Sequence, residues 1–103
     1  MPTEPSAQVG KHVMFENDRV RVWDLDLAPG ESFPAHLHRL DYVIMVVSGG
    51  LLRFDEPGGE RDVQYVDNQV SFRAVGLAGK LDHTLTNIGT TRHRNFVIEL
   101  KPA

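Results

Sequence analysis

The sequence predicts an all-β fold in a single domain, and three observations support this. Short runs rich in β-branched and aromatic residues alternate with turn-forming residues along the chain. No stretch places apolar residues at helical spacing over three turns. The length of 103 residues is typical of one domain. Such a chain favours a small β-sandwich or barrel, whose interior is filled by side chains or opens at one mouth to a small ligand.

The strands are recognisable from alternating side chains and from the turns between them. In residues 19–27, Trp23 and Leu25 lie on one face and Asp24 on the other, a period of two that indicates a strand. The stretch "APGES" ends this strand, because proline fixes φ and glycine permits positive φ. The turn "DEPGGE" separates a later pair. We expect the remaining extended segments at residues 32–38, 41–48, 51–54, 62–66, 69–74, 81–87 and 94–101.

Composition narrows the possible partners and the location of the protein. The net charge is −3 and the arginines are scattered, which predicts no nucleic-acid partner. The longest apolar run, residues 43–47, is too short to span a bilayer, so no membrane partner is expected. Cysteine is absent, and the first residues lack the apolar centre of a secretory signal, so we expect a cytoplasmic protein. Residues 1–18 are predicted to form an N-terminal arm and first edge strand, and residues 19–101 the barrel.

Two histidines stand one residue apart in "PAHLH", just before a strongly apolar strand. His36 and His38 share a face if this segment is extended, so both imidazoles can bind one ion. Imidazole suits zinc, iron, copper and nickel. Histidines on exposed strands are common, however, and the pair alone favours an ordinary polar strand end. A third histidine, His83 in "LDHTLTN", shifts the balance towards a metal site.

The spacing of these histidines belongs to a larger pattern. A glycine precedes the H-x-H pair by five residues, another glycine closes the next strand, and an asparagine follows the third histidine after three residues. These positions are Gly30, His36, His38, Gly49, His83 and Asn87. With this pattern, the chain from about Arg19 to Lys101 resembles the cupin superfamily. The resemblance implies a double-stranded β-helix, or jelly-roll barrel, with His36, His38 and His83 as metal ligands. The implied ion is a divalent transition metal, namely Fe, Mn, Zn, Ni or Cu.

The sequence departs from the cupin pattern at one ligand position. Where cupins carry a glutamate, this chain has Tyr42, and the neighbouring Asp41 has the opposite strand parity. Asp41 could add a carboxylate only if a bulge turned it inward. The chain therefore resembles cupins with three histidine ligands and no carboxylate. Tyr42 could be a distant ligand, a general acid or base, a donor to a bound oxyanion, or a packing residue.

Three functions are compatible with these residues. The first is a metal-dependent enzyme of dioxygenase, isomerase or lyase type that acts on a small oxygenated molecule in the barrel. The second is a non-catalytic cupin that binds a small molecule. The third is a metal-free epimerase or dehydratase, with a histidine as base and Tyr42 as acid. The family resemblance also implies a homodimer.

The positions of five residues that are not proposed as ligands can also be predicted. His12 and His93 lie in polar, turn-like contexts, so both are expected to be exposed. Asn87 is expected to hold a turn through hydrogen bonds from its side chain to the backbone. Arg53 and Arg73 lie on predicted strands and are expected to face solvent, although either could enter the cavity and pair with an anionic ligand.

Overall fold

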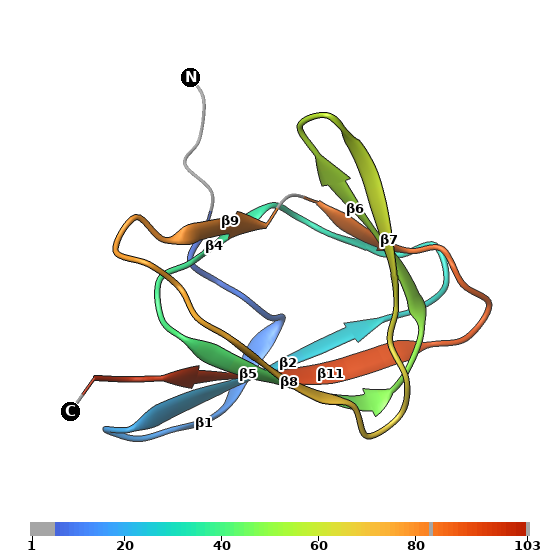
Figure 1. Cartoon of the computed structure of the whole chain (residues 1–103). Helices are drawn as coiled ribbons and strands as arrows, with labels where there is room; N and C mark the ends of the chain where they lie inside the picture. Colours follow the sequence, from blue (N-terminus) through green and yellow to red (C-terminus); the bar gives the residue numbers. More distant parts are fainter. Residues whose placement is uncertain (1–5, 83, 103) are drawn as a thin grey trace.

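A computed structural model describes residues 6–82 and 84–102, which form strands and turns with no helix. The strands make two facing layers (Figure 1). The lower layer is one antiparallel sheet, in the order β1 (His12–Glu16), β2 (Val20–Leu27), β11 (His93–Leu100), β5 (Tyr42–Ser48) and β8 (Val70–Arg73). Across the described ranges, no helix is long and apolar enough to cross a membrane.

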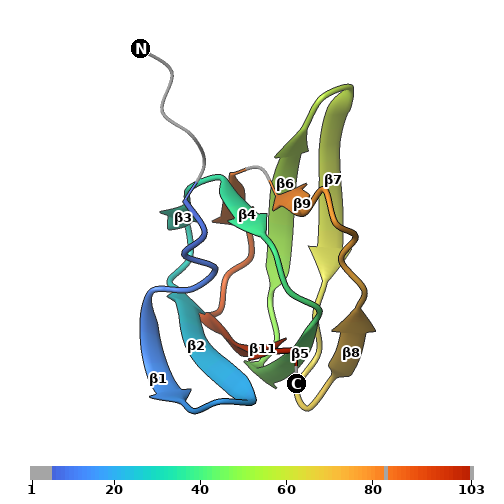
Figure 2. The same cartoon turned by 90° about the vertical axis from the view of Figure 1, so that its left-hand side faces the viewer.

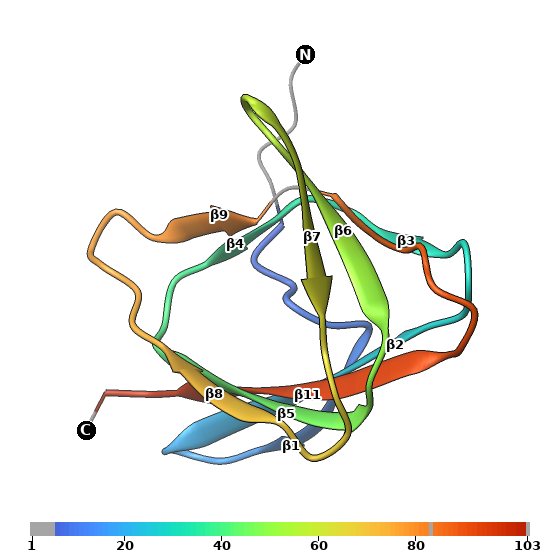
Figure 3. The same cartoon turned by 45° about the vertical axis from the view of Figure 1, so that its right-hand side comes forward.

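The upper layer has two parts. Its four-stranded sheet runs in the order β3 (Ser32–Phe33), β10 (Leu85–Asn87), β6 (Leu51–Glu56) and β7 (Gly59–Gln64). The two-stranded part pairs β4 (His36–His38) with β9 (Lys80–Asp82). The β6–β7 hairpin projects beyond the rest of this layer (Figure 3). The all-β jelly-roll prediction is confirmed.

The strand boundaries differ from the predictions in several places. The segments at residues 32–38 and 81–87 each divide into two short strands, β3 with β4 and β9 with β10. The hairpin turn is also tighter than expected, because β6 continues to Glu56 and β7 begins at Gly59. Gly58 and Gly59 have φ values of 105° and 137°, which only glycine adopts readily, so the reversal needs few residues.

The hydrophobic core lies between the two layers and consists of a larger cluster and a smaller one that contains Val9, Tyr42 and Val97. Leu25 and Leu27 of β2 point inward, as their alternation predicted, and meet Leu52 and Phe54 of β6. Gly49 joins β5 to β6 where the chain passes very close to Tyr65. A Cβ atom on Gly49 would lie 2.2 Å from the Tyr65 carbonyl oxygen. The close approach of these backbone segments therefore requires glycine.

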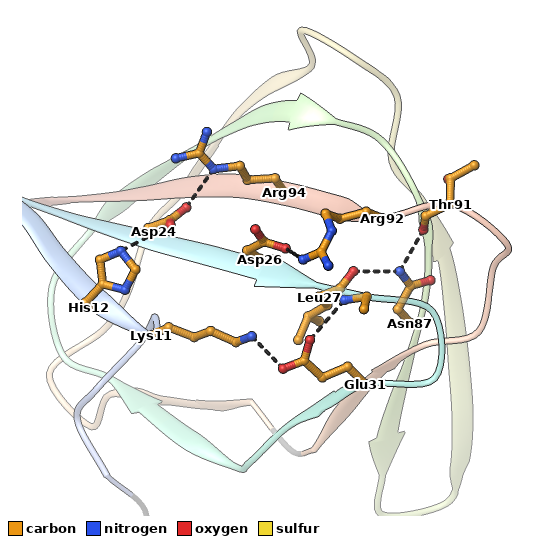
Figure 4. A network of polar contacts seen from close by, with 11 residues as sticks. Lys11, His12, Asp24, Asp26, Leu27, Glu31, Asn87, Thr91, Arg92 and Arg94 are labelled. Carbon is orange, nitrogen blue, oxygen red and sulfur yellow. Dashed lines mark hydrogen bonds and ion pairs between the residues drawn. The ribbon is translucent and has the colours of Figure 1, made fainter.

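Asn87 is fully buried and joins three backbone groups. Its side-chain amide donates to the carbonyl oxygens of Leu27 and Thr91, each at 2.9 Å (Figure 4). Its Oδ1 accepts from the Gly89 amide. The prediction that Asn87 holds a turn is confirmed. Its hydrogen bonds hold the connection between β10 and β11 against the end of β2.

The prediction that His93 is exposed is wrong. His93 begins β11, where every second side chain points between the layers, and its exposed fraction is 0%. Its Nε2 lies 2.7 Å from Oδ1 of Asn95. Burial lowers the pKa of His93, which favours the neutral ring. The flanking Arg92 and Arg94 point outward and pair with aspartates of β2 (Figure 4). His12 is exposed as predicted.

Apolar side chains gather on one part of the outer face of the five-stranded sheet, over β5, β8 and the middle of β11. Met45 of β5 is paired with Val70 of β8 and with Phe96 of β11, and Val43 is paired with Phe72. Residues paired across an antiparallel sheet share a face, so these five side chains form a continuous surface. Met45, Val70 and Phe72 are exposed by 39%, 60% and 55%. Apolar surfaces of this kind commonly mark protein–protein contacts.

We propose that two copies of the chain pair through this outer face, as the family resemblance implies. Phe72→Arg would place a charge in the contact, so the variant should sediment as a monomer while the wild type sediments as a dimer. Leu77→Arg is the matched control, because Leu77 is exposed in the loop between β8 and β9. A monomeric wild type in sedimentation velocity, or an unchanged Phe72→Arg dimer, would contradict this proposal.

Candidate metal centre

The pairing of β4 with β9 brings the polar residues of the site together. His36 is paired with Asp82, and His38 is paired with Lys80. In an antiparallel ladder, paired residues project from the same face, so all four side chains point into the space between the layers. Leu81, between Lys80 and Asp82, points the other way and is exposed. The alternation along two short strands thus builds the site.

Both histidines converge on one carboxylate oxygen. The Nε2 atom of His38 lies 3.1 Å from Oδ2 of Asp82, and the Nε2 atom of His36 lies 3.6 Å from the same oxygen. Ligand atoms of the three residues all lie within 4.8 Å of one another. His36 and His38 are each 3% exposed, so the cluster is shielded from solvent.

The surroundings of His36 select one tautomer of its ring. Its Nδ1 lies 3.0 Å from the carbonyl oxygen of Pro34. Because a carbonyl oxygen can only accept, Nδ1 carries a hydrogen. Nε2, which faces the carboxylate of Asp82, then holds either a proton shared with that carboxylate or, in the neutral ring, a lone pair that a cation can bind. Such an arrangement suits a cation between the two atoms, and metal-bound histidines commonly donate their other N–H group to a backbone carbonyl.

The charge state of Asp82 also suits a metal ion. Burial would raise the pKa of Asp82, but the imidazoles of His36 and His38 and the charge of Lys80 outweigh that effect and lower it. The Nζ atom of Lys80 lies 3.3 Å from Oδ1, on the other side of the carboxylate. Asp82 is therefore ionised, and Oδ2 is the oxygen directed at the histidines.

Tyr42 forms the wall beside this cluster. Its ring stacks on His38 with the centroids 4.0 Å apart, and its hydroxyl oxygen lies 3.4 Å from Nζ of Lys80. Tyr42 is 1% exposed. Burial, reinforced by the negative charge of Asp82, raises the pKa of Tyr42, so the hydroxyl stays protonated. A protonated phenol is a poor metal ligand but can donate a proton or a hydrogen bond.

A cavity of about 270 Å³ opens beside the cluster. Its lining includes His36, His38, Asp82 and Tyr42, with apolar side chains from both layers. Val9 covers part of it and is 1% exposed, where the N-terminal segment crosses towards β1 (Figure 2). This volume is sufficient for a small molecule beside the two histidines.

Comparisons with known proteins agree with this architecture. No family model matches the chain. The crystal structure of a cupin domain from Bordetella pertussis Tohama I has a TM-score of 0.77 and 24% identity, and the match covers 98% of this chain and 100% of that one. The β-alanine degradation protein BauB of Pseudomonas aeruginosa is 32% identical over 75 residues, which are 73% of this chain and 75% of that protein. The chain belongs to the cupin superfamily. An RmlC-like cupin with a double-stranded β-helix fold from Methanocaldococcus jannaschii has a TM-score of 0.61 and 14% identity, and the match covers 90% of this chain and 92% of that one.

The site of this cupin contains a carboxylate that the sequence did not predict. A continuous strand through residues 81–87 would place His83 on one face and Asp82 on the other. The structure divides the segment into β9 and β10, so alternation does not carry across the break. Lys80 is paired with His38, and residues two apart on a strand share a face, so Asp82 lies on the same face as the histidines. An expectation based on this strand would have placed Asp82 in the site.

The structure gives a different outcome for each of the predicted metal ligands. His36 and His38 lie together in the site. His83 lies outside the described residues, so a three-histidine site stays a prediction. Asp41 points away from the cavity, and its Oδ1 accepts a hydrogen bond from the Val75 amide at 2.7 Å. Among the described residues, the carboxylate close to the histidines of this cupin is that of Asp82.

Proposed function

We propose that this cupin is a metal-dependent enzyme that acts on a small oxygenated molecule in its cavity. His36, His38 and Asp82 would hold a divalent transition metal, with His83 as a further predicted ligand. The main support is the convergence of two Nε2 atoms on Oδ2 of Asp82, with Nδ1 of His36 held by the carbonyl oxygen of Pro34 so that its Nε2 is directed at that oxygen. Imidazole nitrogen and carboxylate oxygen together suit Zn, Fe, Mn, Ni or Cu.

The reaction is proposed to be of dioxygenase, isomerase or lyase type. A divalent ion in this site would supply Lewis acidity towards an oxygen atom of the substrate. The histidines and Tyr42 are buried, so the polar groups at the inner end of the cavity are shielded from bulk water. BauB is named as a protein of β-alanine degradation, and β-alanine is a three-carbon molecule, which supports a small substrate here.

Tyr42 is proposed to donate a proton to the substrate. Its hydroxyl is kept protonated by burial, and it faces the same cavity as the two histidines. If the proton moves to the substrate, the ammonium group of Lys80 at 3.4 Å lowers the cost of the phenolate left behind. Tyr42 and Lys80 together thus form an acid within reach of a bound molecule.

Tyr42→Phe should leave metal content nearly unchanged and lower turnover about 100-fold, because it removes only the transferable proton. Metal content is measured by elemental analysis, and turnover by NMR or oxygen uptake with small carbonyl compounds. Tyr65→Phe is the matched comparison, since Tyr65 lines the same cavity without stacking on His38, and it should be less affected. Loss of metal in Tyr42→Phe would make Tyr42 a ligand, and full activity would make it a packing residue.

Elemental analysis of protein purified without added metal tests the proposal as a whole. Stoichiometric metal that is lost in His36→Ala and His38→Ala would support it. Metal without turnover of any candidate substrate would favour the non-catalytic binding protein. Activity that survives complete chelation would favour the metal-free epimerase or dehydratase and would overturn the metal-dependent mechanism.

A further inference from the structure

Positive side chains line the cavity of this cupin from three strands. Arg61 of β7, Arg73 of β8 and Lys80 of β9 all contribute to its lining, against the single carboxylate of Asp82. The three strands lie on one side of the molecule (Figure 2). Imidazole rings carry no negative charge in either protonation state, so the cavity has an excess of positive charge before any metal binds. An anionic ligand is attracted to such a cavity.

Two of these cations already have carboxylate partners. Nε of Arg61 donates to Oε1 of Glu56 at 2.8 Å, and Nζ of Lys80 lies 3.3 Å from Asp82. Arg73 forms no ion pair with another described residue, and its side chain donates only to the carbonyl oxygen of Phe72 at 3.3 Å. Its guanidinium therefore has donors left for a ligand.

The position of Arg73 in the sheet directs it towards the site. Arg73 is paired across the ladder with Tyr42, so both side chains project from the inner face of the sheet. Tyr42 in turn stacks on His38. Arg73 is thus separated from the histidine and aspartate cluster by one side chain. A small molecule can span that interval, with one end at Arg73 and the other at the cluster.

We infer that the cavity binds a small monocarboxylate whose carboxylate group is held by Arg73, and that this molecule is the substrate in the proposed function. A guanidinium matches a carboxylate through two parallel hydrogen bonds. A single negative charge suits Arg73, which is the one cation of the cavity lining without a carboxylate partner among the residues that the structure describes. A phosphate dianion would require Arg61 or Lys80 to leave its own carboxylate. The apolar lining, which includes Ile44, Phe54 and Val97, suits a short carbon chain.

The test titrates metal-free, ¹⁵N-labelled protein with propanoate, with the neutral propanamide and with inorganic phosphate, and follows the NMR spectrum. Propanoate should bind at least about 10-fold more tightly than propanamide. Arg73→Gln should weaken propanoate binding about 10–100-fold. Arg73→Lys should weaken it less, because lysine keeps the positive charge but lacks the two parallel N–H donors of the guanidinium. Arg53→Gln is the matched control, since Arg53 pairs with Asp62 and does not line the cavity.

Equal binding of propanoate and propanamide, or unchanged binding in Arg73→Gln, would overturn the inference. If phosphate bound more tightly than propanoate, the ligand would be a phosphate and the assignment of a carboxylate would be wrong. Zinc affinity is measured on the same samples. If the wild type binds zinc but not propanoate, only this inference is overturned. If it binds propanoate but no metal, only the metal-dependent mechanism is overturned.

Discussion

Asp82→Asn is expected to weaken metal binding by at least about 100-fold without unfolding the protein. Removal of a partner outside the ligand set commonly costs about 10–100-fold in metal affinity, and loss of an anionic ligand should cost more. The substitution is nearly isosteric, so the amide oxygen can still accept from His38. The removed charge is the one that faces Nε2 of His36. The variant therefore tests the effect of the negative charge on metal binding while the size and shape of the side chain stay nearly the same.

Isothermal titration with Zn²⁺ measures this effect, and thermal unfolding verifies that the variant is folded. Asp62→Asn serves as the control, because Asp62 pairs with Arg53 on an exposed part of the β6–β7 hairpin. Its zinc affinity should equal that of the wild type. If Asp82→Asn also bound zinc with wild-type affinity, Asp82 would be excluded as a ligand, and His36 and His38 would need another partner.

Gly49→Ala is expected to reduce the free energy of unfolding by about 3 kcal/mol, which is at the upper end of the usual cost of overpacking. The added Cβ would lie 2.2 Å from the carbonyl oxygen of Tyr65 and 2.7 Å from the Cα atom of Val66. Both atoms belong to the backbone, so no side-chain rotation can relieve the contact. The junction between β5 and β6 would have to move away from the segment after β7.

Urea unfolding followed by tryptophan fluorescence measures this loss. Gly76→Ala is the matched control, because a Cβ at Gly76 meets nothing within 4 Å and its backbone is not in the positive-φ region. The control should be neutral or more stable by up to about 1 kcal/mol, since alanine restricts the unfolded chain. A Gly49→Ala protein as stable as this control would show that the junction can relax.

Alternation along single strands was sufficient to predict much of the fold. It correctly placed Leu25 and Leu27 in the core and His36 beside His38. It failed where a strand boundary was misjudged. His93 was assigned to a turn, but it begins β11 and lies on the inner face with Asn95 and Val97. One shift in a strand boundary thus changed an expected surface residue into a buried one.

The sequence by itself determined the strand order along the chain and the shared face of His36 and His38. These properties depend on local periodicity and on residue type, which act over a few neighbouring residues. Only the tertiary structure decided that Asp82 joins the histidines and that Arg73 faces the cavity. Both depend on which residue lies opposite in the ladder, Asp82 across from His36 and Arg73 across from Tyr42. Those partners are 46 and 31 positions apart in the sequence, and their pairing is set by packing of the whole barrel.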